Sequence, residues 1–368
     1  MSDTITTLDA LKEHLYLAMQ LEHATIPPYL TALYSIKPGT NVDAVQVIRV
    51  VAVEEMLHLT IAANLLNAIG GIPDLTRPGF VPSYPAHLPD GETDFKVSLA
   101  SFTKETLAIF KKIERPRLAP GSHKLVKRMY RSGVTVLGRY PGASDMQYYS
   151  IGDFYAAIEE GFDRLEREAK TAGKTIFIGD PKRQVTSDYY YSGGGELFPV
   201  ADIESARSAI RLVMEQGEGA GGGIYDHERE LAHYYRFDEL DRERYYQPED
   251  RAGHPTGPTF SVDWHAVYPV KTDLKLGDID SKKSPELYEA ALSFNQTYAA
   301  FLELLTQAFN GQPQLLLEAV PRMFEFRNLM GDLIRNPLPD YPGQYAMATF
   351  EIGYNQVLRT VAVEEAGA

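Results

Sequence analysis

Apolar side chains recur every three or four residues along two long stretches near the start of the chain. The first covers residues 8–35, and the second runs from about residue 43 to residue 69. This spacing is typical of amphipathic helices, and the intervening "IKPGTN" at 36–41 contains the Pro-Gly pair expected of a turn. Because both stretches are long and strongly apolar, they are predicted to form two buried, antiparallel helices of a bundle.

Shorter stretches with the same period follow, separated by segments rich in proline and glycine. Long insertions are expected at 80–102, a loop with one short strand, and at 124–150, where a basic cluster is expected to form a solvated face. The other predicted helices lie at 103–118, 151–172, 202–223, 225–241, 284–309 and 313–335. The last two are joined by "NGQP" and are predicted to form a helical hairpin, so the fold class is mainly α.

Pro27 and Pro28 lie inside the first predicted helix. A proline removes one backbone donor, and its ring collides with the carbonyl group four residues earlier. Two outcomes are open: the helix breaks and restarts, or it continues with a distortion that makes room for a ligand nearby.

Glu22 belongs to the inward-facing set of the first helix, while Glu55 and His58 share one face of the second. Glu22 and Glu55 lie almost equally far from the turn near Gly39, so antiparallel helices would place them at the same depth. Carboxylates and an imidazole are costly in an apolar interior unless they pair with each other or bind a cation. A buried polar network and a metal site are both consistent with these three residues. Glu54 is a candidate for a residue that contacts the metal ligands without binding the metal itself.

A second Glu-x-x-His frame occurs at Glu230 and His233. Glu218 lies at the end of the preceding predicted helix. Across a tight antiparallel turn, Glu218 and Glu230 would differ by about 6 Å in level along the helix axes. Glu159 and Glu215 are the alternatives to Glu218 as the carboxylate ligand from this part of the chain. A Glu from each of two helices, with Glu-x-x-His from each of the other two, is the ligand set of dinuclear iron or manganese helical bundles. The repeated frame therefore favours a metal site over a polar network.

The composition narrows the choice of metal and partner. The 368 residues include no cysteine, so any metal must be bound by histidine and carboxylate, which suits iron or manganese. A formal net charge of −14 argues against nucleic acid and anionic membranes as partners. No apolar run of about 18 residues predicts a membrane span, and the first residues lack the pattern of a secretory signal, so a cytoplasmic protein is expected.

Several motifs, in order from about residue 8 to residue 240, resemble a known family. They are "LEHATIPPYLTALYSI", "VAVEEMLHLTIAANLLNAIGGIP", "IGDFYAAI", "EQGEG" and "ELAHYYRF". The chain is similar to the ferritin-like domain of the VioB, or iminophenylpyruvate dimer synthase, type. This resemblance implies oxidative coupling of aromatic imino acids in bisindole pigment pathways. Its metal ligands would correspond to Glu22, Glu55, His58, Glu218, Glu230 and His233.

Taken together, these features predict a mainly α, ferritin-like four-helix bundle with long loop insertions and a C-terminal helical hairpin. Residues 1–243 would form the metal-binding bundle, and residues 244–368 a wrapping segment and helical extension packed on it as one domain. The expected function is that of a non-haem oxidoreductase with two iron ions, or manganese, acting with dioxygen on a small, aromatic amino-acid-derived metabolite. An imine dimer synthase, an iron-storing ferroxidase and a metal-free scaffold are the alternatives; a homodimer is the expected assembly.

Overall fold

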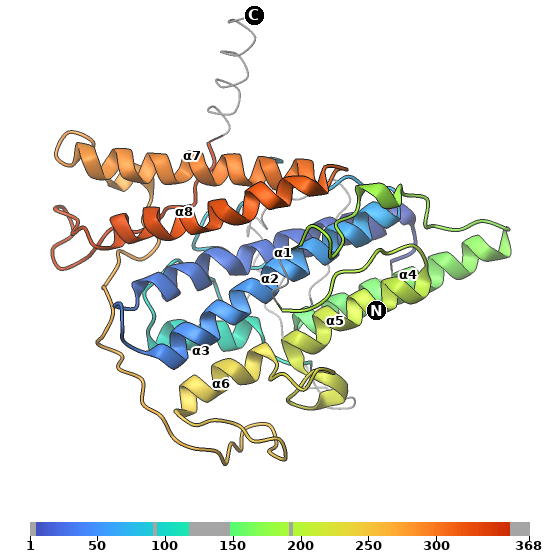
Figure 1. Ribbon diagram of the computed structural model, residues 1–368, viewed down its shortest axis with the longest axis horizontal. Helices are drawn as coiled ribbons and strands as arrows, with labels where there is room; N and C mark the ends of the chain where they lie inside the picture. Colours follow the sequence, from blue (N-terminus) through green and yellow to red (C-terminus); the bar gives the residue numbers. More distant parts are fainter. Residues whose placement is uncertain (1–4, 91–93, 118–147, 191–193, 354–368) are drawn as a thin grey trace, which may run out of the picture.

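The computed structural model describes residues 5–90, 94–117, 148–190 and 194–353. Over these residues the secondary structure is helical, with short 3-10 turns and only isolated β-bridges, and the mainly α prediction is confirmed (Figure 1). The helices are α1 (Leu8–Ser35), α2 (Val42–Ala68), α3 (Lys104–Ile113), α4 (Ile151–Thr171), α5 (Ile203–Glu218), α6 (His233–Arg242), α7 (Pro285–Ala308) and α8 (Leu316–Ile334).

Helices α1 and α2 form the antiparallel pair that the apolar period predicts. Thr7 caps α1, accepting a hydrogen bond from the backbone N–H of Ala10, and Gly39 takes a left-handed φ of 81° in the turn that follows. Both helices are buried on almost every side over their middle turns, because the other helices pack around them (Figure 1). Polar side chains on these turns are therefore held away from bulk water.

The two prolines do not break α1, which continues as one helix of 28 residues. The Pro28 ring leaves the carbonyl of Ala24 without its usual donor, and the Tyr84 hydroxyl donates to that oxygen at 2.8 Å. The Thr31 hydroxyl donates to the carbonyl of Pro27 at 2.8 Å. The Tyr84 hydroxyl thus satisfies the carbonyl that Pro28 leaves without a donor. Because α1 is continuous through both prolines, the alternative of a helix that breaks and restarts is wrong.

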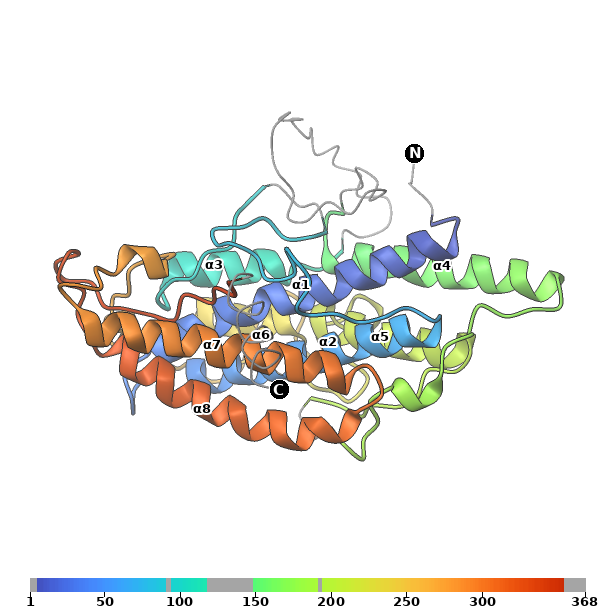
Figure 2. The same ribbon diagram turned by 90° about the horizontal axis from the view of Figure 1, so that it is seen from above.

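The remaining positions of the bundle are filled by shorter helices that meet near its middle. Helices α3 and α6 pack on each other toward one end of the long axis, and α4 and α5 pair toward the other end (Figures 1 and 2). Helix α4 also contacts α1, and α2 contacts both α5 and α6. The C-terminal ends of α3 and α5 and the N-terminal ends of α4 and α6 therefore come together around the buried middle turns of α1 and α2.

Helices α7 and α8 form the predicted C-terminal hairpin, which packs along α1 (Figure 2). Tyr298 of α7 contacts His23 of α1, with 2.5 Å between the hydroxyl oxygen and Nε2. The segment before α7 binds the α1–α2 turn, where Lys37 N–H donates to the carbonyl of Ala266 at 2.9 Å. The hairpin and this segment leave the middle of α1 facing the other bundle helices.

Two predictions concern the insertions. Over the described residues of 80–102, the expected strand is reduced to one antiparallel bridge, between Ala86 and Val97. Most of 124–150, including its basic cluster, lies outside the described residues. Among the helices that are described, none is long and apolar enough to cross a membrane.

Candidate metal centre

Five acidic and histidine side chains meet where the four short helices converge on α1 and α2. Glu22, Glu55 and His58 offer ligand atoms within 4.8 Å of one another, and so do Glu55, Glu114 and His233. Glu55 belongs to both sets, so the cluster has the form of two sites that share one carboxylate. All five side chains are buried, with Glu55 only 1% exposed.

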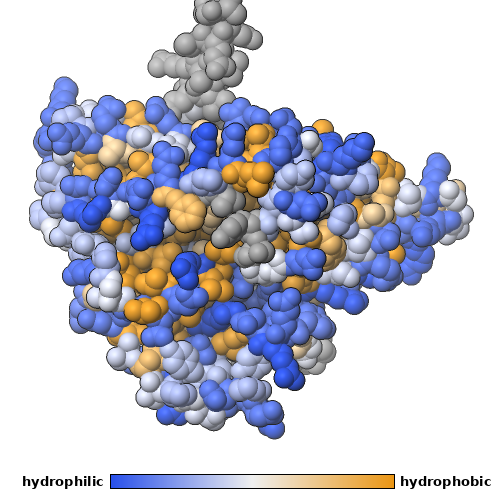
Figure 3. Space-filling view, viewed as in Figure 1, coloured by the Kyte–Doolittle hydropathy of each residue, from blue (hydrophilic) through white to orange (hydrophobic). Residues whose placement is uncertain are grey.

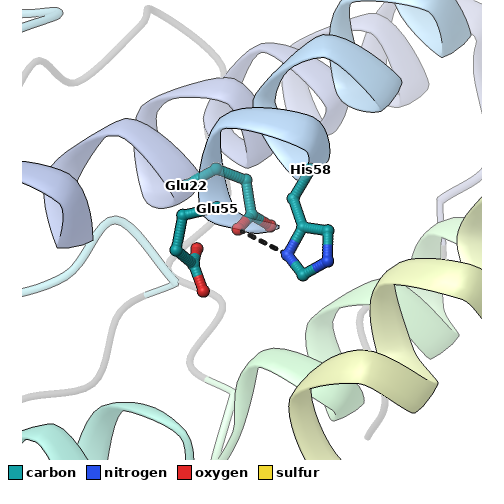
Figure 4. Close-up of side chains that lie close together, drawn as sticks. All are labelled: Glu22, Glu55 and His58. Carbon is teal, nitrogen blue, oxygen red and sulfur yellow. Dashed lines mark ion pairs between the residues drawn. The ribbon is translucent and has the colours of Figure 1, made fainter. Parts of the chain in front are cut away.

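Each side chain of the first set is placed by helix geometry. Glu55 and His58 lie one turn apart on α2, and Glu22 faces them from α1, as the equal-depth argument predicts (Figure 4). The carboxylate of Glu22 points toward the His58 ring, with 3.6 Å between Oε2 and Nδ1. The second set is completed from helix ends, because Glu114 caps the C-terminus of α3 and His233 is the first residue of α6.

A hydroxyl group binds each carboxylate of the cluster from outside. The Tyr155 hydroxyl donates to Glu22 Oε1 at 2.6 Å. The Thr25 hydroxyl shares its one hydrogen between the backbone carbonyl of Glu22, at 2.7 Å, and Glu55 Oε2, at 3.1 Å. The Tyr29 hydroxyl donates to Glu114 Oε1. These bonds leave the second oxygen of each carboxylate free to face the other members of the cluster. Outer hydrogen bonds of this kind orient the ligands in metal proteins.

The two imidazoles are arranged alike. Nε2 of His233 lies 2.8 Å from Glu54 Oε2, and Nε2 of His58 lies 2.8 Å from the side-chain oxygen of Gln216. Each Nδ1 therefore faces the carboxylates; that of His233 lies 3.0 Å from Glu55 and 3.4 Å from Glu114. The His233 Nδ1 is buried and makes no hydrogen bond of good geometry. An inward nitrogen with the outer N–H held by an acceptor is the usual arrangement of a metal-ligating histidine.

The electrostatics show an excess of negative charge in this volume. Burial, followed by the charges of Glu114 and Glu22, raises the pKa of Glu55 well above its ordinary value. Burial lowers the pKa of His233, but Glu114, Glu54 and Glu55 outweigh it and raise that pKa well above normal. Protons on Glu55 and His233 would thus offset part of the buried negative charge in the absence of a cation. Burial also acts to raise the pKa of Glu22, but His58 outweighs it and lowers that pKa. Carboxylate oxygens and imidazole nitrogens in this arrangement fit iron or manganese.

Glu218 lines the same pocket but does not join the cluster. Its carboxylate accepts hydrogen bonds from Arg117, at 2.5 Å from Nε and 2.9 Å from the backbone N–H. Gly152 at the start of α4 makes room for it, because a Cβ there would lie 2.3 Å from Glu218 Oε2. The structure therefore places the predicted third carboxylate in the wall of the pocket, paired with an arginine.

The alternatives to Glu218 lie farther out. Glu159 forms an ion pair with Arg211 at 3.4 Å, and Glu215 pairs with the exposed His227. Neither lines the pocket that contains the cluster. The structure thus brings neither of them to the candidate ligands.

Glu230 is not brought to the cluster either, and the predicted helix that carried it is wrong. Helix α6 begins only at His233. Glu230 lies before it in a hairpin turn, and the backbone N–H of Glu230 donates to Asp226 Oδ1 at 2.8 Å. Asp226 closes this turn, which replaces the first part of the helix expected at 225–241. The Glu230 side chain is 64% exposed and pairs with Arg236, so Glu230 and His233 do not share a helical face.

Glu114 is the member of the cluster that sequence reasoning missed. It directly follows α3, whose buried positions include Leu107 and Phe110, so Glu114 continues the same apolar face one turn later. That spacing was the available signal. A carboxylate that continues the buried face of an amphipathic helix, just before Pro116, would have marked it as a candidate.

Comparison with known proteins identifies the family of the segment that carries the cluster. The ferritin-like family matches residues 15–242, which include every member of the cluster. A dichlorochromopyrrolate synthase from Lentzea aerocolonigenes is 28% identical over 309 residues, covering 77% of this chain and 27% of the relative. A 2-imino-3-(indol-3-yl)propanoate dimerase from Chromobacterium violaceum is 27% identical over 204 residues, covering 52% of this chain and 16% of the relative. The chain thus spans about a quarter or less of the length of these relatives.

A solved structure supports the same fold. A ferritin-like protein from Caulobacter vibrioides superposes with a TM-score of 0.60 at 22% sequence identity, covering 95% of this chain and 100% of that protein. The two biosynthetic relatives match the family that the opening motifs resemble. The chain belongs to the ferritin-like family.

Proposed function

We propose that the chain is a metal-dependent oxidoreductase with two ions, iron or manganese, that acts with dioxygen on a small metabolite. The observation that carries this proposal is the buried cluster of three carboxylates and two imidazoles, divided into two sets that share Glu55. Such a concentration of charge is costly in a bundle interior unless cations compensate it. Two divalent ions would be held by Glu22, Glu55, His58, Glu114 and His233.

Residues around the candidate ligands hold either the carboxylates or the imidazole rings in place. Tyr155, Thr25 and Tyr29 fix the carboxylates through their hydroxyl groups, and Glu54 and Gln216 fix the imidazole rings. Such outer partners keep the donor atoms in place when the ions enter. When bound, the ions supply dioxygen binding and electron transfer, and the surrounding bundle limits the access of water.

The substrate is proposed to be an aromatic amino-acid-derived acid in natural-product biosynthesis. Both curated relatives carry names of biosynthetic enzymes, and one name states an α-imino acid with an indole ring. The pocket that contains the cluster is also lined by apolar Ile151, Val213 and Met214 and by Arg115, side chains of the kind that contact an apolar ring and a carboxylate. Its cavity of about 20 Å³ would have to widen to admit such a substrate. Imine dimerisation is the specific alternative within this class, since it joins two imines with loss of two electrons and two protons, which dioxygen can accept.

The test supplies the iron-loaded protein with an imine made in place from L-tryptophan by an L-amino-acid oxidase. Product formation that requires dioxygen is expected, and a mass of two imines less two hydrogens would identify dimerisation. A Glu55→Ala, His58→Ala double variant is the control and should form no product. Turnover that is equal in the double variant, or in the absence of dioxygen, would refute the proposal.

A further inference from the structure

The outer partners of the two candidate histidines differ in charge. His233 is held by Glu54, a carboxylate, and His58 by Gln216, a neutral amide, at the same distance of 2.8 Å. Both partners are buried, with Glu54 6% exposed and Gln216 4% exposed. The structure thus surrounds two similar imidazoles with different electrostatic environments.

The position of each partner is fixed by further contacts. The amide nitrogen of Gln216 donates to the carbonyl of Gly194, so its oxygen must be the atom that faces His58. On the other side, Arg236 approaches Glu54 only at 3.9 Å and turns to Glu230 at 3.2 Å. Glu54 Oε1 is the oxygen that faces Arg236, so Oε2 is left to accept from the outer nitrogen of His233.

The two halves of the cluster are otherwise matched. Each has one carboxylate of its own, Glu22 or Glu114, and each of these accepts a hydrogen bond from a tyrosine hydroxyl. Glu55 is common to both. The charge on Glu54 is thus the main difference, and a carboxylate that accepts the outer N–H of an imidazole makes the inner nitrogen a stronger ligand.

We propose that the two metal positions are inequivalent, and that Glu54 makes the position formed by His233, Glu55 and Glu114 the first to fill. The position formed by His58, Glu22 and Glu55 binds its ion more weakly, because Gln216 adds no charge. This inference rests on the proposed function and adds an order of binding to it. Glu54 and Gln216 are positioning residues, since they act through the histidines and touch no ion.

The test is a Co²⁺ titration of the metal-free protein, read by visible absorption and by competition with a chelator. Two binding steps are expected, although repulsion between two close cations also separates the steps in a symmetric site. The effects of two variants on the affinity of each step therefore decide whether the two positions differ. Glu54→Gln should weaken the first step by about 10–100-fold and leave the second step little changed. Gln216→Glu should tighten the second step.

Variants of each histidine assign the binding steps to the two positions, and a variant of a remote glutamate serves as the control. His233→Ala should remove the tight step, whereas His58→Ala should retain it. Glu166→Gln is the matched control, because Glu166 is a buried helix glutamate that bonds Thr175 and the backbone N–H of Ile176, away from the cluster. Thermal unfolding checks that each variant folds; if Glu54→Gln does not, the histidine pair and Gln216→Glu decide alone.

The outcomes separate this inference from the proposed function. Wild-type protein that binds no Co²⁺ would overturn both. Two bound ions with equal losses in His233→Ala and His58→Ala, or with steps that Glu54→Gln moves no more than Glu166→Gln does, would overturn the inequivalence alone. A first step lost with His233 and weakened with Glu54 would establish it.

Discussion

At the scale of single residues, hydroxyl groups outside the cluster determine how its carboxylates point. Tyr155 is the clearest case, because its hydroxyl lies 2.6 Å from Glu22 Oε1 and has no other acceptor in the described structure. Removing that oxygen would let the Glu22 carboxylate rotate away from His58. The free energy of metal binding is therefore distributed over residues that touch no ion.

We predict that Tyr155→Phe weakens binding of Mn²⁺ by about tenfold while the chain stays folded. Tyr298→Phe is the matched control, since that buried hydroxyl bonds His23 and not a candidate ligand. Competition with a chelator measures the affinity of each variant. Equal affinities for the Tyr155 and Tyr298 variants would show that the hydroxyl of Tyr155 does not position a ligand.

The raised pKa values of Glu55 and His233 predict how metal stabilisation depends on pH. Both groups hold protons more tightly in the folded chain, so they stabilise the metal-free fold at low pH. That contribution to stability is lost as the pH rises through the raised pKa values of the two groups. For His233 this pKa lies well above the ordinary value of 6.5. A bound cation displaces these protons, so the increase in Tm caused by Mn²⁺ should be larger at about pH 8 than at about pH 6. An increase that is equal or smaller at the higher pH would contradict this.

At the scale of elements, the glycine-rich segment before α5 supports the outer partners. Gly194 has a φ of +79°, and a Cβ at this position would lie 2.4 Å from Glu54 Cγ. Its carbonyl also accepts the hydrogen bond from Gln216. This single glycine thus contacts the partners of both candidate histidines.

Gly194→Ala should therefore reduce both stability and metal affinity. Gly39→Ala is the control, because Gly39 has a similar φ of +81° but nothing within 4 Å of its Cβ position. The control should incur only the left-handed backbone penalty of about 1 kcal/mol. The Gly194 variant should lose about 1–3 kcal/mol more through the collision with Glu54. Chemical denaturation measures the difference, and equal losses would show that the segment can move aside.

The sequence predicts elements well where many residues contribute to one pattern. Helices α1 and α2 and the hairpin of α7 and α8 follow from long apolar periods, and Glu22, Glu55 and His58 follow from α1 and α2. Glu230 was misplaced because a short polar turn, closed by Asp226, replaces the first turns of the expected helix. Glu114 was missed because its role depends on where the end of α3 meets the bundle. Such contacts between distant segments leave little trace in local spacing.

At the scale of the whole molecule, the additional segments distinguish this chain from a bare bundle. The α7–α8 hairpin covers one side of α1, and the segment before it binds the α1–α2 turn. The face in Figure 3 combines hydrophilic residues with hydrophobic patches. Among the described residues, Val42, Leu317 and Phe324 are exposed hydrophobic side chains, at 70%, 64% and 67%. A storage shell requires bundle faces that pack repeatedly against copies, and the hairpin occupies one of them.

We therefore predict a small assembly, with a homodimer as the proposed form. Native mass spectrometry of the iron-loaded protein should give a monomer or dimer with about two ions per chain. A large shell, or many iron ions per chain after aerobic loading, would instead support iron storage. The same spectra report mass and metal content together, so the two readings are separated in one experiment.

The most direct test of the metal centre compares Glu114, which the structure places in the cluster, with Glu230, which the sequence predicted as a ligand. Wild-type protein, Glu114→Gln and Glu230→Gln would be loaded with iron without dioxygen, desalted and measured by ICP-MS. We expect about two ions per chain in the wild type and in Glu230→Gln, and a clear loss in Glu114→Gln, because only Glu114 lies in the cluster. Iron retained in Glu114→Gln and lost in Glu230→Gln would contradict the site described above.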